Sequence, residues 1–378
     1  MSTNMVNPKT GDYDDLLHIG PGNIESFTGR ILDNVNTVKN DNLISGKFHF
    51  NPNDIIYGKI NPQLAKYVHV DFEGLASADA YVLNSKNGVN QGFLFVELQT
   101  SGFYKYSVSV SMRTGMPKIN RDELNQFSYL APKNIEEQQR IGSFFKQLDE
   151  TIALHQRKLD KLNLLKQGYL QQLFPQNDEK VPRVRFANFK NEWEQRKLGS
   201  LATIVRGASP RPIQDPKWFD NESDIGWLRI TDVTEQDGRI YHLEQHISKL
   251  GQAKTRVLIE PHLLLSIAAT VGKPVVNYVK TGVHDGFLIF LSPTFEREFM
   301  FQWLEMFRPK WQKYGQPGSQ VNLNSELVRN QEIVLPNHKE QQKIGVFLKQ
   351  IDKAIILHKS KLDKLISLKK VLLQKMFI

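Results

Sequence analysis

Two stretches of the chain, residues 137–174 and 340–377, carry apolar residues on alternating steps of four and three. This spacing places the apolar side chains on one face of an α-helix, so we predict a long helix over each stretch. At 1.5 Å per residue each helix is about 55 Å long, and a seam of that length needs a second helix to cover it. Because the chain provides two such helices, we predict that they pair as an intramolecular antiparallel coiled coil. The predicted helix seam consists of Ile141, Phe145, Leu148, Ile152, Leu159, Leu162, Ile344, Leu348, Ile351, Ile355, Leu362 and Leu365.

The two stretches are copies of one sequence. They lie 203 residues apart and are identical at 22 of 38 positions. Repeats of solenoids and propellers are much shorter, so this period indicates a duplicated domain with its connector. Each copy starts with a capping box, in which an asparagine is followed three residues later by a glutamate. The two boxes are Asn134 with Glu137 and Asn337 with Glu340.

A histidine interrupts the seam at the same place in both copies, His155 in the first and His358 in the second. A recurring histidine on a helix suggests either a ligand or a proton switch. It also suits a polar residue that fixes the register of a helix pair, as a buried asparagine does. We favour the second interpretation.

The segments outside the long helices are rich in short apolar runs separated by Gly, Pro, Asn and Asp, which is typical of strands and turns. The later segment also predicts a helix over residues 295–313. The earlier segment repeats the plan faintly, for example in Thr28-Gly-Arg-Ile31 against Asp237-Gly-Arg-Ile240. We therefore predict an α+β fold in which two mainly β domains alternate with the two helices. The predicted boundaries are 1–131 and 176–335 for the β domains, and 132–175 and 336–378 for the helices.

The two predicted β domains differ at their start. The stretch 193–211 of the second domain has no counterpart in the first when the two are aligned. We expect either that the true start of the protein lies upstream or that this is a shortened form. In the second case the first domain would lack an edge element.

Composition narrows the possible partners. The chain has 378 residues, with 49 Lys and Arg against 40 Asp and Glu, a formal net charge of +9 and a pI near 9.3. A basic balance favours a polyanion as partner. Cysteine is absent, which excludes disulfides and thiolate zinc sites. The longest apolar stretch, 263–271, is too short to span a membrane, and the N-terminus has no signal-peptide core. We expect a cytoplasmic protein that does not bind membranes.

Catalytic motifs are missing from the sequence. It contains no (Asn/Asp/Ser)-Pro-Pro-aromatic loop of an amino-methyltransferase, no Gly-x-x-x-x-Gly-Lys-(Ser/Thr) phosphate loop and no Glu-x-Lys nuclease motif. The spacing His242-x-Glu244-x-His246 is not that of a zinc protease, and we expect no metal there. The sequence therefore predicts a protein without catalytic residues.

The ordered combination of motifs resembles the specificity (S) subunits of type I restriction-modification systems. The resemblance rests on Glu-Gln-Gln-(Lys/Arg)-Ile before each Leu-rich helix and on the segments 189–199, 226–233 and 315–324. It implies two target recognition domains, each of which reads one half of a split double-stranded DNA target. It also implies that the paired helices act as a spacer and dock two methyltransferase (M) subunits, which restriction and translocation (R) subunits join. Cofactors are expected on those partners, namely S-adenosylmethionine, ATP and Mg, and none in this chain.

The residues expected to contact DNA are Arg, Lys, Asn, Gln and Ser side chains on loops. Arg can pair with guanine, and Asn or Gln with adenine, through two hydrogen bonds each. Lys more often contacts phosphate, and any of these side chains can instead be a solvated surface group. The candidates in the second domain are Arg206, Arg211, Lys217, Arg229, Lys254, Arg256, Lys273, Gln316, Ser319, Gln320 and Asn322. Those in the first domain are Lys59, Asn61, Lys66, Arg113 and Lys118.

One alternative of a different class stays open at this point. The chain could be a non-catalytic coiled-coil adaptor whose β domains bind protein or RNA. Exposed aromatic side chains for base stacking would favour RNA, and only Trp218, Phe219 and Trp227 in the second domain hint at them.

Overall fold

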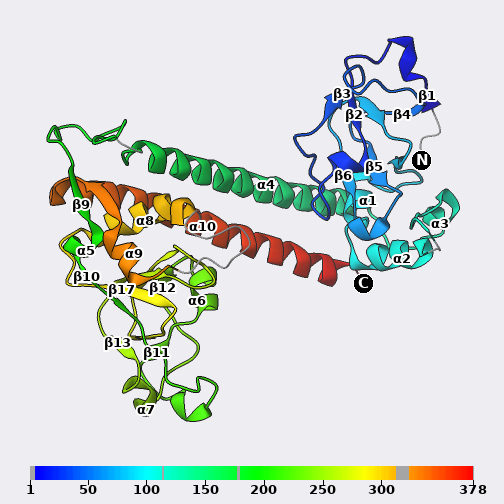
Figure 1. Cartoon of the computed structure of the whole chain (residues 1–378). Coiled ribbons are helices and arrows are strands. Elements are labelled where there is room, and N and C mark those ends of the chain that lie inside the picture. The colour runs from blue at the N-terminus through cyan, green and yellow to red at the C-terminus, as the bar shows by residue number, and fades with distance from the viewer. Residues whose placement is uncertain (1–4, 113–114, 177–178, 312–322, 378) are drawn as a thin grey trace. The chain divides into compact units, whose positions relative to one another are not determined.

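The computed structural model describes residues 5–112, 115–176, 179–311 and 323–377. It consists of two compact units. Unit 1 comprises Met1–Lys158 with His358–Ile378, and unit 2 comprises Leu159–Leu357. The two long helices, α4 (Ile135–Gln172) and α10 (His338–Met376), each contribute one end to each unit (Figure 1). Each unit therefore contains its own stretch of both helices.

The described residues of unit 1 form two sheets and three short α-helices besides the long ones. The five-stranded sheet has the order β1 (Met5–Val6), β4 (Lys47–Phe50), β7 (Gly74–Ala76), β2 (Leu17–Ile19) and β3 (Asn36–Thr37). The three-stranded sheet has the order β6 (Tyr67–His69), β5 (Ile55–Gly58) and β8 (Ala80–Leu83). The pair β2 and β7 is parallel and the other pairs are antiparallel. The helices are α1 (Gln91–Glu97), α2 (Ser101–Ser111) and α3 (Arg121–Asn125).

Three sheets form in the part of unit 2 that the structure describes. The largest has the order β10 (Thr203–Arg206), β17 (Phe287–Leu291), β14 (Leu263–Ser266), β15 (Pro274–Asn277) and β12 (Arg239–Ile240). The second has the order β11 (Gly226–Trp227), β16 (Thr281–Val283) and β13 (Arg256–Leu258), and the third pairs β18 (Glu332–Leu335) with β9 (Glu194–Lys197). The helices are α5 (Leu198–Leu201), α6 (Ile230–Glu235), α7 (Lys249–Gln252), α8 (Arg297–Trp311) and α9 (Ser325–Asn330).

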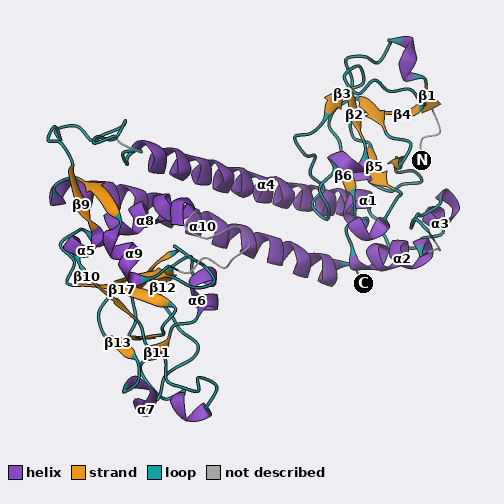
Figure 2. Cartoon of the chain, viewed as in Figure 1, coloured by secondary structure: helices purple, strands orange, loops and turns teal. Residues whose placement is uncertain are grey.

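The two units share one strand plan. The strand sets β4-β7-β2 and β6-β5-β8 of unit 1 have the same order as β13-β16-β11 and β15-β14-β17 of unit 2. In both units the pair formed by the first and fifth strands of this plan in chain order, β2 with β7 and β11 with β16, is parallel. The faint sequence repeat therefore reflects a repeated fold, and the predicted α+β class is confirmed (Figure 2). The helix predicted over 295–313 is α8.

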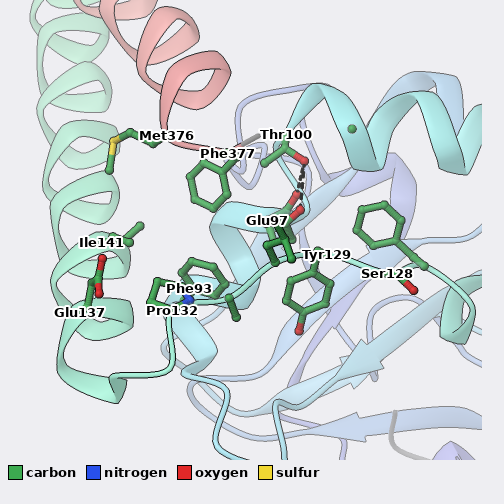
Figure 3. Close-up of a pocket in the computed structure, with 14 residues that line it drawn as sticks. Phe93, Glu97, Thr100, Ser128, Tyr129, Pro132, Glu137, Ile141, Met376 and Phe377 are labelled. Carbon is green, nitrogen blue, oxygen red and sulfur yellow. Dashed lines mark hydrogen bonds between the residues drawn. The ribbon is translucent and has the colours of Figure 1, made fainter.

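The units differ at one edge. In unit 2, β9 pairs with β18 and β10 extends the large sheet beside β17. In the described part of unit 1, the residues that match β18 at the 203-residue offset, 129–132, form no strand, and β8 pairs with β5 alone. A groove lies beside this segment, where Phe93 of α1 contacts Phe377 and Tyr129 (Figure 3).

The long helices pack antiparallel in both units, as predicted. In unit 1 the ring of Phe145 contacts that of Phe377, and Asp149 Oδ1 lies 2.6 Å from Lys369 Nζ. Further along α4, the Nδ1 atoms of His155 and His358 lie 2.9 Å apart. The contact residues thus rise in number along α4 while their partners fall in number along α10, as in an antiparallel pair.

Unit 2 repeats the pairing with equivalent residues exchanged. Lys166 Nζ lies 2.6 Å from Asp352 Oδ1, and this pair corresponds to Lys369 and Asp149 at the 203-residue offset. Equivalent residues therefore meet reciprocally, as in a self-complementary interface. The twelve seam residues are all buried or half-buried. Those buried are Phe145, Leu148, Ile344, Leu348, Ile351 and Leu362, and those half-buried are Ile141, Ile152, Leu159, Leu162, Ile355 and Leu365.

The predicted capping asparagines do cap the helices, whereas one glutamate of the boxes has a different partner. Asn134 Oδ1 accepts from Glu136 N at 2.8 Å, and Asn337 Oδ1 accepts from Glu340 N at 3.1 Å. The fully buried Glu340 carboxylate accepts two hydrogen bonds from Arg185 instead of bonding back to its own helix start. The ion pair of Arg185 with Glu340 thus replaces the hydrogen bond that a capping box forms between the glutamate and its own helix start. The spacing of residues in the sequence does not reveal this replacement.

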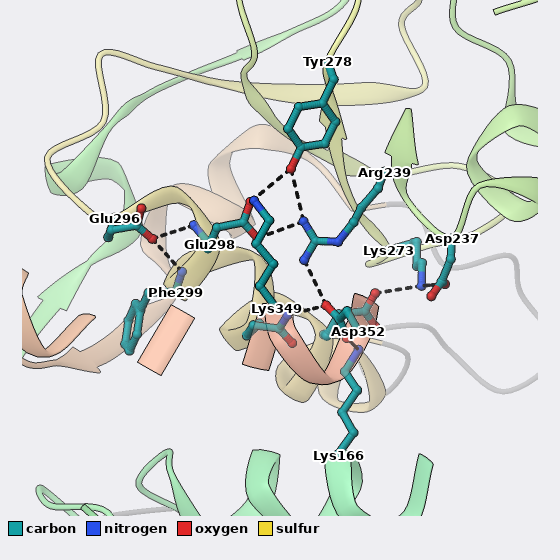
Figure 4. A network of polar contacts seen from close by, with 12 residues as sticks. Lys166, Asp237, Arg239, Lys273, Tyr278, Glu296, Glu298, Phe299, Lys349 and Asp352 are labelled. Carbon is teal, nitrogen blue, oxygen red and sulfur yellow. Dashed lines mark hydrogen bonds and ion pairs between the residues drawn. The ribbon is translucent and has the colours of Figure 1, made fainter. Parts of the chain in front are cut away.

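A buried ionic network fastens the sheets of unit 2 to α8 and α10 (Figure 4). The Arg239 side chain is only 4% exposed; it lies 2.8 Å from Glu298 and 2.9 Å from Asp352. Lys349 also reaches Glu298, at 2.8 Å. Although burial opposes its charge, these carboxylates raise the pKa of Arg239. A buried pair of this kind costs several kcal/mol when one partner is removed, because the other charge is left without compensation.

The histidine pair makes the helix pairing sensitive to pH. Burial, together with the neighbouring His358, Lys361 and Lys158, lowers the pKa of His155. The unfolded chain therefore takes up this proton at a higher pH than the folded chain. The stabilising contribution is present above the unfolded pKa of about 6.5 and is lost as the pH falls below it.

We predict that the thermal unfolding temperature of the chain falls between about pH 7 and pH 5, and that the double variant H155N/H358N shows a smaller fall. Asparagine keeps a polar pair at this position but has no titrating group. Circular dichroism at 222 nm follows the helices during melting. Parallel pH curves for the two proteins would show that the histidine pair does not titrate in this range.

Candidate nucleic-acid interface

Three arginines predicted to bind DNA lie together in unit 2 around Asp285. Arg211 Nη2 donates to the Asp285 carboxylate at 2.8 Å, and Arg206 Nε donates to the Asp285 carbonyl at 2.6 Å. Arg256 Nε donates to the Arg206 carbonyl at 2.7 Å. All three arginines are exposed. We call Arg206, Arg211, Arg256 and Asp285 the Asp285 cluster.

The carboxylate at the centre of the Asp285 cluster stays ionised. Burial opposes its charge, but the hydrogen bond from Ser209 at 2.7 Å and the charge of Arg211 lower the pKa of Asp285. Strand β10 carries Arg206, and its pairing with β17 brings this arginine close to the loop that holds Asp285. The pairing of this edge strand therefore fixes Arg206 beside Asp285, and all three arginines remain exposed.

A cavity of about 300 Å³ adjoins the Asp285 cluster. Arg229 lines it and is held in place by Asp232 at 2.8 Å and Glu244 at 3.1 Å. These bonds, that of Asp232 above all, raise the pKa of Arg229. The cavity is lined by Ser209, Arg211, Ile213, Trp227, Arg229, Ile230, His284 and Asp285. A concave basic site with an aromatic wall can receive a phosphate or a base edge.

The three lysines predicted in the second domain have different environments. Lys217 is exposed, with its ammonium 4.6 Å from the centre of the Trp218 ring, and Lys254 is exposed on the loop before β13. The Lys273 side chain is 12% exposed and lies between Asp237 at 2.5 Å and Glu305 at 2.7 Å. Lys273 is therefore placed as a structural residue of unit 2.

In unit 1, three basic side chains gather near Tyr81. The Lys59 ammonium lies 5.6 Å from the centre of the Tyr81 ring. Burial, with the charges of Lys118 and Arg121, lowers the pKa of Lys59. The strand-like bridge between Ile60 and residue 118 brings the lysines together. Sequence reasoning missed Arg121, although its place three residues after Lys118 was a usable signal.

The remaining candidates of both domains are less accessible to a ligand or lie outside the described residues. Lys66 Nζ donates to the Ile24 carbonyl at 2.6 Å, and Asn61 holds the turn before residues 62–64 with its backbone in the left-handed region. The candidates Arg113, Gln316, Ser319, Gln320 and Asn322 all fall outside the described residues.

The described residues show no sign of a metal site or a membrane helix. They contain no group of three or more side chains that could bind a metal ion together. His246, one of the two histidines in the spacing noted above, uses both ring nitrogens on the carbonyls of Ser223 and Leu243. No described helix combines the length and the apolar character needed to cross a membrane.

The fold is that of a duplicated protein, in which two α+β units with basic side chains on their surface share a pair of long helices. A family model described as type I restriction modification DNA specificity domain matches residues 7–164 and again residues 190–367. The two matches cover most of the chain. The chain therefore belongs to the family of type I restriction-modification DNA specificity domains.

Several relatives are named specificity subunits. The type I restriction enzyme EcoDI specificity subunit of Escherichia coli is 32% identical over 166 residues, which span 43% of this chain and 37% of that protein. The MjaVIII specificity subunit of Methanocaldococcus jannaschii is 23% identical over 325 residues, or 79% of this chain and 72% of that protein. The match to the E. coli subunit thus spans little more than a third of its length.

Solved structures share the fold. The S subunit of a type I restriction-modification system from M. genitalium has a TM-score of 0.67 and 13% identity, over 100% of this chain and 91% of that one. A chain from a study of complex assembly and conformational transition of the type I R-M system has a TM-score of 0.54 and 18% identity, over 99% of this chain and 94% of that one. At these identities the likeness concerns the fold alone.

The different burial of Lys273 and Arg211 predicts different consequences of truncation. We expect K273A to lower the free energy of unfolding by about 2 kcal/mol, because the largely buried Glu305 carboxylate loses its partner. R211A is the control, since an exposed ion pair contributes only about 0–1 kcal/mol. Urea unfolding measures both variants. Equal destabilisation would show that the Lys273 pair is no more structural than a surface pair.

Proposed function

We propose that the chain is the DNA-reading specificity subunit of a type I restriction-modification complex. Each recognition domain, residues 1–131 and 176–335, reads one half of a bipartite double-stranded DNA target. The paired helices set the spacing of the two half-sites. In this role the chain itself catalyses no reaction.

The proposal rests on one observation: each of the two repeated units carries its own group of basic side chains. The DNA specificity model matches once in the first half of the chain and once in the second. Each unit also presents a group of basic side chains, the Asp285 cluster in unit 2 and the group of Lys59, Lys118 and Arg121 in unit 1. Different residues on equal scaffolds suit two readers of different sequences.

The outer faces of the helices support a docking role. Apolar side chains that do not belong to the seam are exposed on α4, among them Leu164 at 67% and Leu165 at 46%. Others are exposed on α10, among them Leu357 and Leu368. Exposed apolar side chains on a helix are typical of protein-binding surfaces. We assign these faces to two methyltransferase subunits, which restriction and translocation subunits join.

The chemistry of the complex then belongs to the partners. S-adenosylmethionine, ATP and Mg are bound by the methyltransferase and restriction subunits, and this chain binds none of them. Because such a subunit acts on DNA inside the cell, we propose that the chain is cytoplasmic. The alternative of an adaptor for protein or RNA loses support, because the family model is one of DNA specificity.

We predict that R211A weakens binding of the assembled specificity and methyltransferase complex to its target duplex by about tenfold or more, since a good base contact contributes about 1–3 kcal/mol. If Arg211 contacts phosphate instead, the loss extends to all sequences and the slope of log K against log salt falls by about one. The matched control is R183A, because Arg183 is also exposed and paired with one carboxylate, Glu179 at 3.2 Å. Fluorescence anisotropy at several salt concentrations measures both. Equal effects of the two variants would remove Arg211 from the interface.

The decisive test of the function is an exchange of domains. We predict that replacing residues 181–335 by the corresponding domain of a relative changes one half of the methylated target and leaves the other half unaltered. Sequencing of methylated adenines in host DNA shows both halves at once, and a strain without this gene provides the background. A target in which both halves change, or neither, contradicts one reader for each half-site.

A further inference from the structure

A histidine that sequence reasoning did not select lines the cavity beside the Asp285 cluster. His284 directly precedes Asp285 in the chain, and its side chain is half-buried in the cavity wall. The centre of its ring lies 4.8 Å from that of Phe287 and 5.8 Å from that of Trp227. Two aromatic neighbours thus hold the imidazole in place.

A backbone hydrogen bond determines which nitrogen of this ring carries the hydrogen. Gly286 N donates to His284 Nδ1 at 2.9 Å. Burial lowers the pKa of His284, although the charge of Asp285 opposes the shift, so the ring is neutral at neutral pH. A neutral imidazole whose Nδ1 accepts a hydrogen bond carries its hydrogen on Nε2. The close approach requires a glycine at position 286, because a Cβ there would collide with the ring.

The Nε2–H group of His284 is a donor that the fold itself does not use. In the part of the chain that the structure describes, Nε2 has no hydrogen-bond partner, yet the atom is not enclosed in the core. The ring is fixed by a hydrogen bond and by two aromatic contacts, and it lies in the wall of a cavity of about 300 Å³. A donor preorganised in this way is suited to an acceptor on a ligand.

Arg229 provides a second donor in the same cavity. Its Nε and Nη2 atoms donate to Asp232 at 3.1 and 2.8 Å, and Nη2 also donates to Glu244 at 3.1 Å. Its Nη1 atom has no partner among the described residues. Because Asp232 is only 2% exposed, withdrawal of the arginine would leave a buried carboxylate without its partner. Arg229 therefore offers Nη1 alone, and a second hydrogen bond to the same base needs another side chain.

The number of donors distinguishes between the four bases. In the major groove guanine presents two neighbouring acceptors, N7 and O6. Adenine presents one acceptor beside an amino group, thymine presents one acceptor beside a methyl group, and cytosine presents an amino group. Two donors in one cavity therefore fit guanine, and the amino group of adenine or cytosine opposes them.

We propose that His284 is a specificity-determining residue of the second recognition domain, and that it reads one guanine of the half-site together with Arg229. His284 Nε2–H donates to one acceptor of this guanine, and Arg229 Nη1 donates to the other. The inference rests on the proposed function, because it names a base that the domain of residues 176–335 reads.

Base analogues test the two hydrogen bonds one at a time. 7-Deazaguanine lacks N7, and 2-aminopurine lacks O6. Sequencing of methylated adenines gives the target, and each guanine of the half-site assigned to the second domain is then replaced by each analogue. Fluorescence anisotropy measures binding of the assembled specificity and methyltransferase complex. At one guanine we expect each analogue to weaken binding by the wild-type chain about tenfold.

The variant H284F identifies the histidine as the donor. Phenylalanine keeps an aromatic ring between Trp227 and Phe287 but has no nitrogen, and circular dichroism verifies the fold. We expect H284F to bind the unmodified target about tenfold more weakly and to lose its sensitivity to at least one of the two analogues. The matched control is H242F, because His242 is an exposed histidine of unit 2 outside the cavity. It should keep the wild-type response to both analogues.

Three results would overturn the inference and leave the proposed function intact. They are a half-site without guanine, wild-type binding that neither analogue weakens at any guanine of that half-site, and an H284F variant that responds to both analogues as H242F does. The first two need no variant, so they do not depend on the folding of H284F. An assembled wild-type complex that binds no specific duplex would contradict the proposed function itself, and with it this inference.

Discussion

The pairing of α4 with α10 is the contact on which both units depend. A helix of 38 residues with an apolar seam is not stable in water alone, and each unit covers its stretch of one helix with a stretch of the other. Because the copies are antiparallel, equivalent residues meet reciprocally, and a buried aspartate faces a lysine in each unit. At the histidine pair a residue meets its own equivalent. Duplication of a single helix sequence thus produces a self-complementary interface without a second gene.

The equivalent aspartates of the two units, Asp149 and Asp352, have pKa values shifted in opposite directions. Asp352 accepts from both Lys166 and Arg239, and these bonds lower its pKa although burial opposes them. At the equivalent Asp149, burial dominates over Lys369 and the pKa is raised. The reason lies in the arginine, since Arg30, the equivalent of Arg239, is bonded to Glu25 at 2.9 Å. Arg239 therefore fastens the sheets of unit 2 to α8 and α10 by charge, whereas the equivalent arginine of unit 1 is engaged with Glu25.

The sequence was sufficient for the helices, their direction and the repeated β plan, because these depend on periodicity and on local turn chemistry. It was not sufficient for the candidate interface. Lys273 was predicted to contact DNA, yet it lies between two carboxylates that come from different parts of the chain, Asp237 and Glu305. Arg185 could not be assigned either, because its partner Glu340 is 155 residues away. Pairing over such distances depends on the fold, and no local pattern records it.

The magnitude of each ion pair decides which basic side chains are available for DNA. An exposed pair such as Arg211 with Asp285 is worth about 0–1 kcal/mol, while a bidentate contact to a base is worth about 1–3 kcal/mol, so exchange of partners is favourable. The pair of Lys273 with the largely buried Glu305 contributes more, since withdrawal of the lysine costs about 2 kcal/mol. In the proposed role, Arg211, Arg206 and Arg256 would therefore leave their present acceptors for a duplex at little cost, and Lys273 at a greater cost. The negative charge of Asp285 also repels a DNA phosphate, unless the phosphate takes an arginine away from the carboxylate. An acid at the centre of a basic cluster weakens non-specific attraction and leaves the contacts that the correct site can replace.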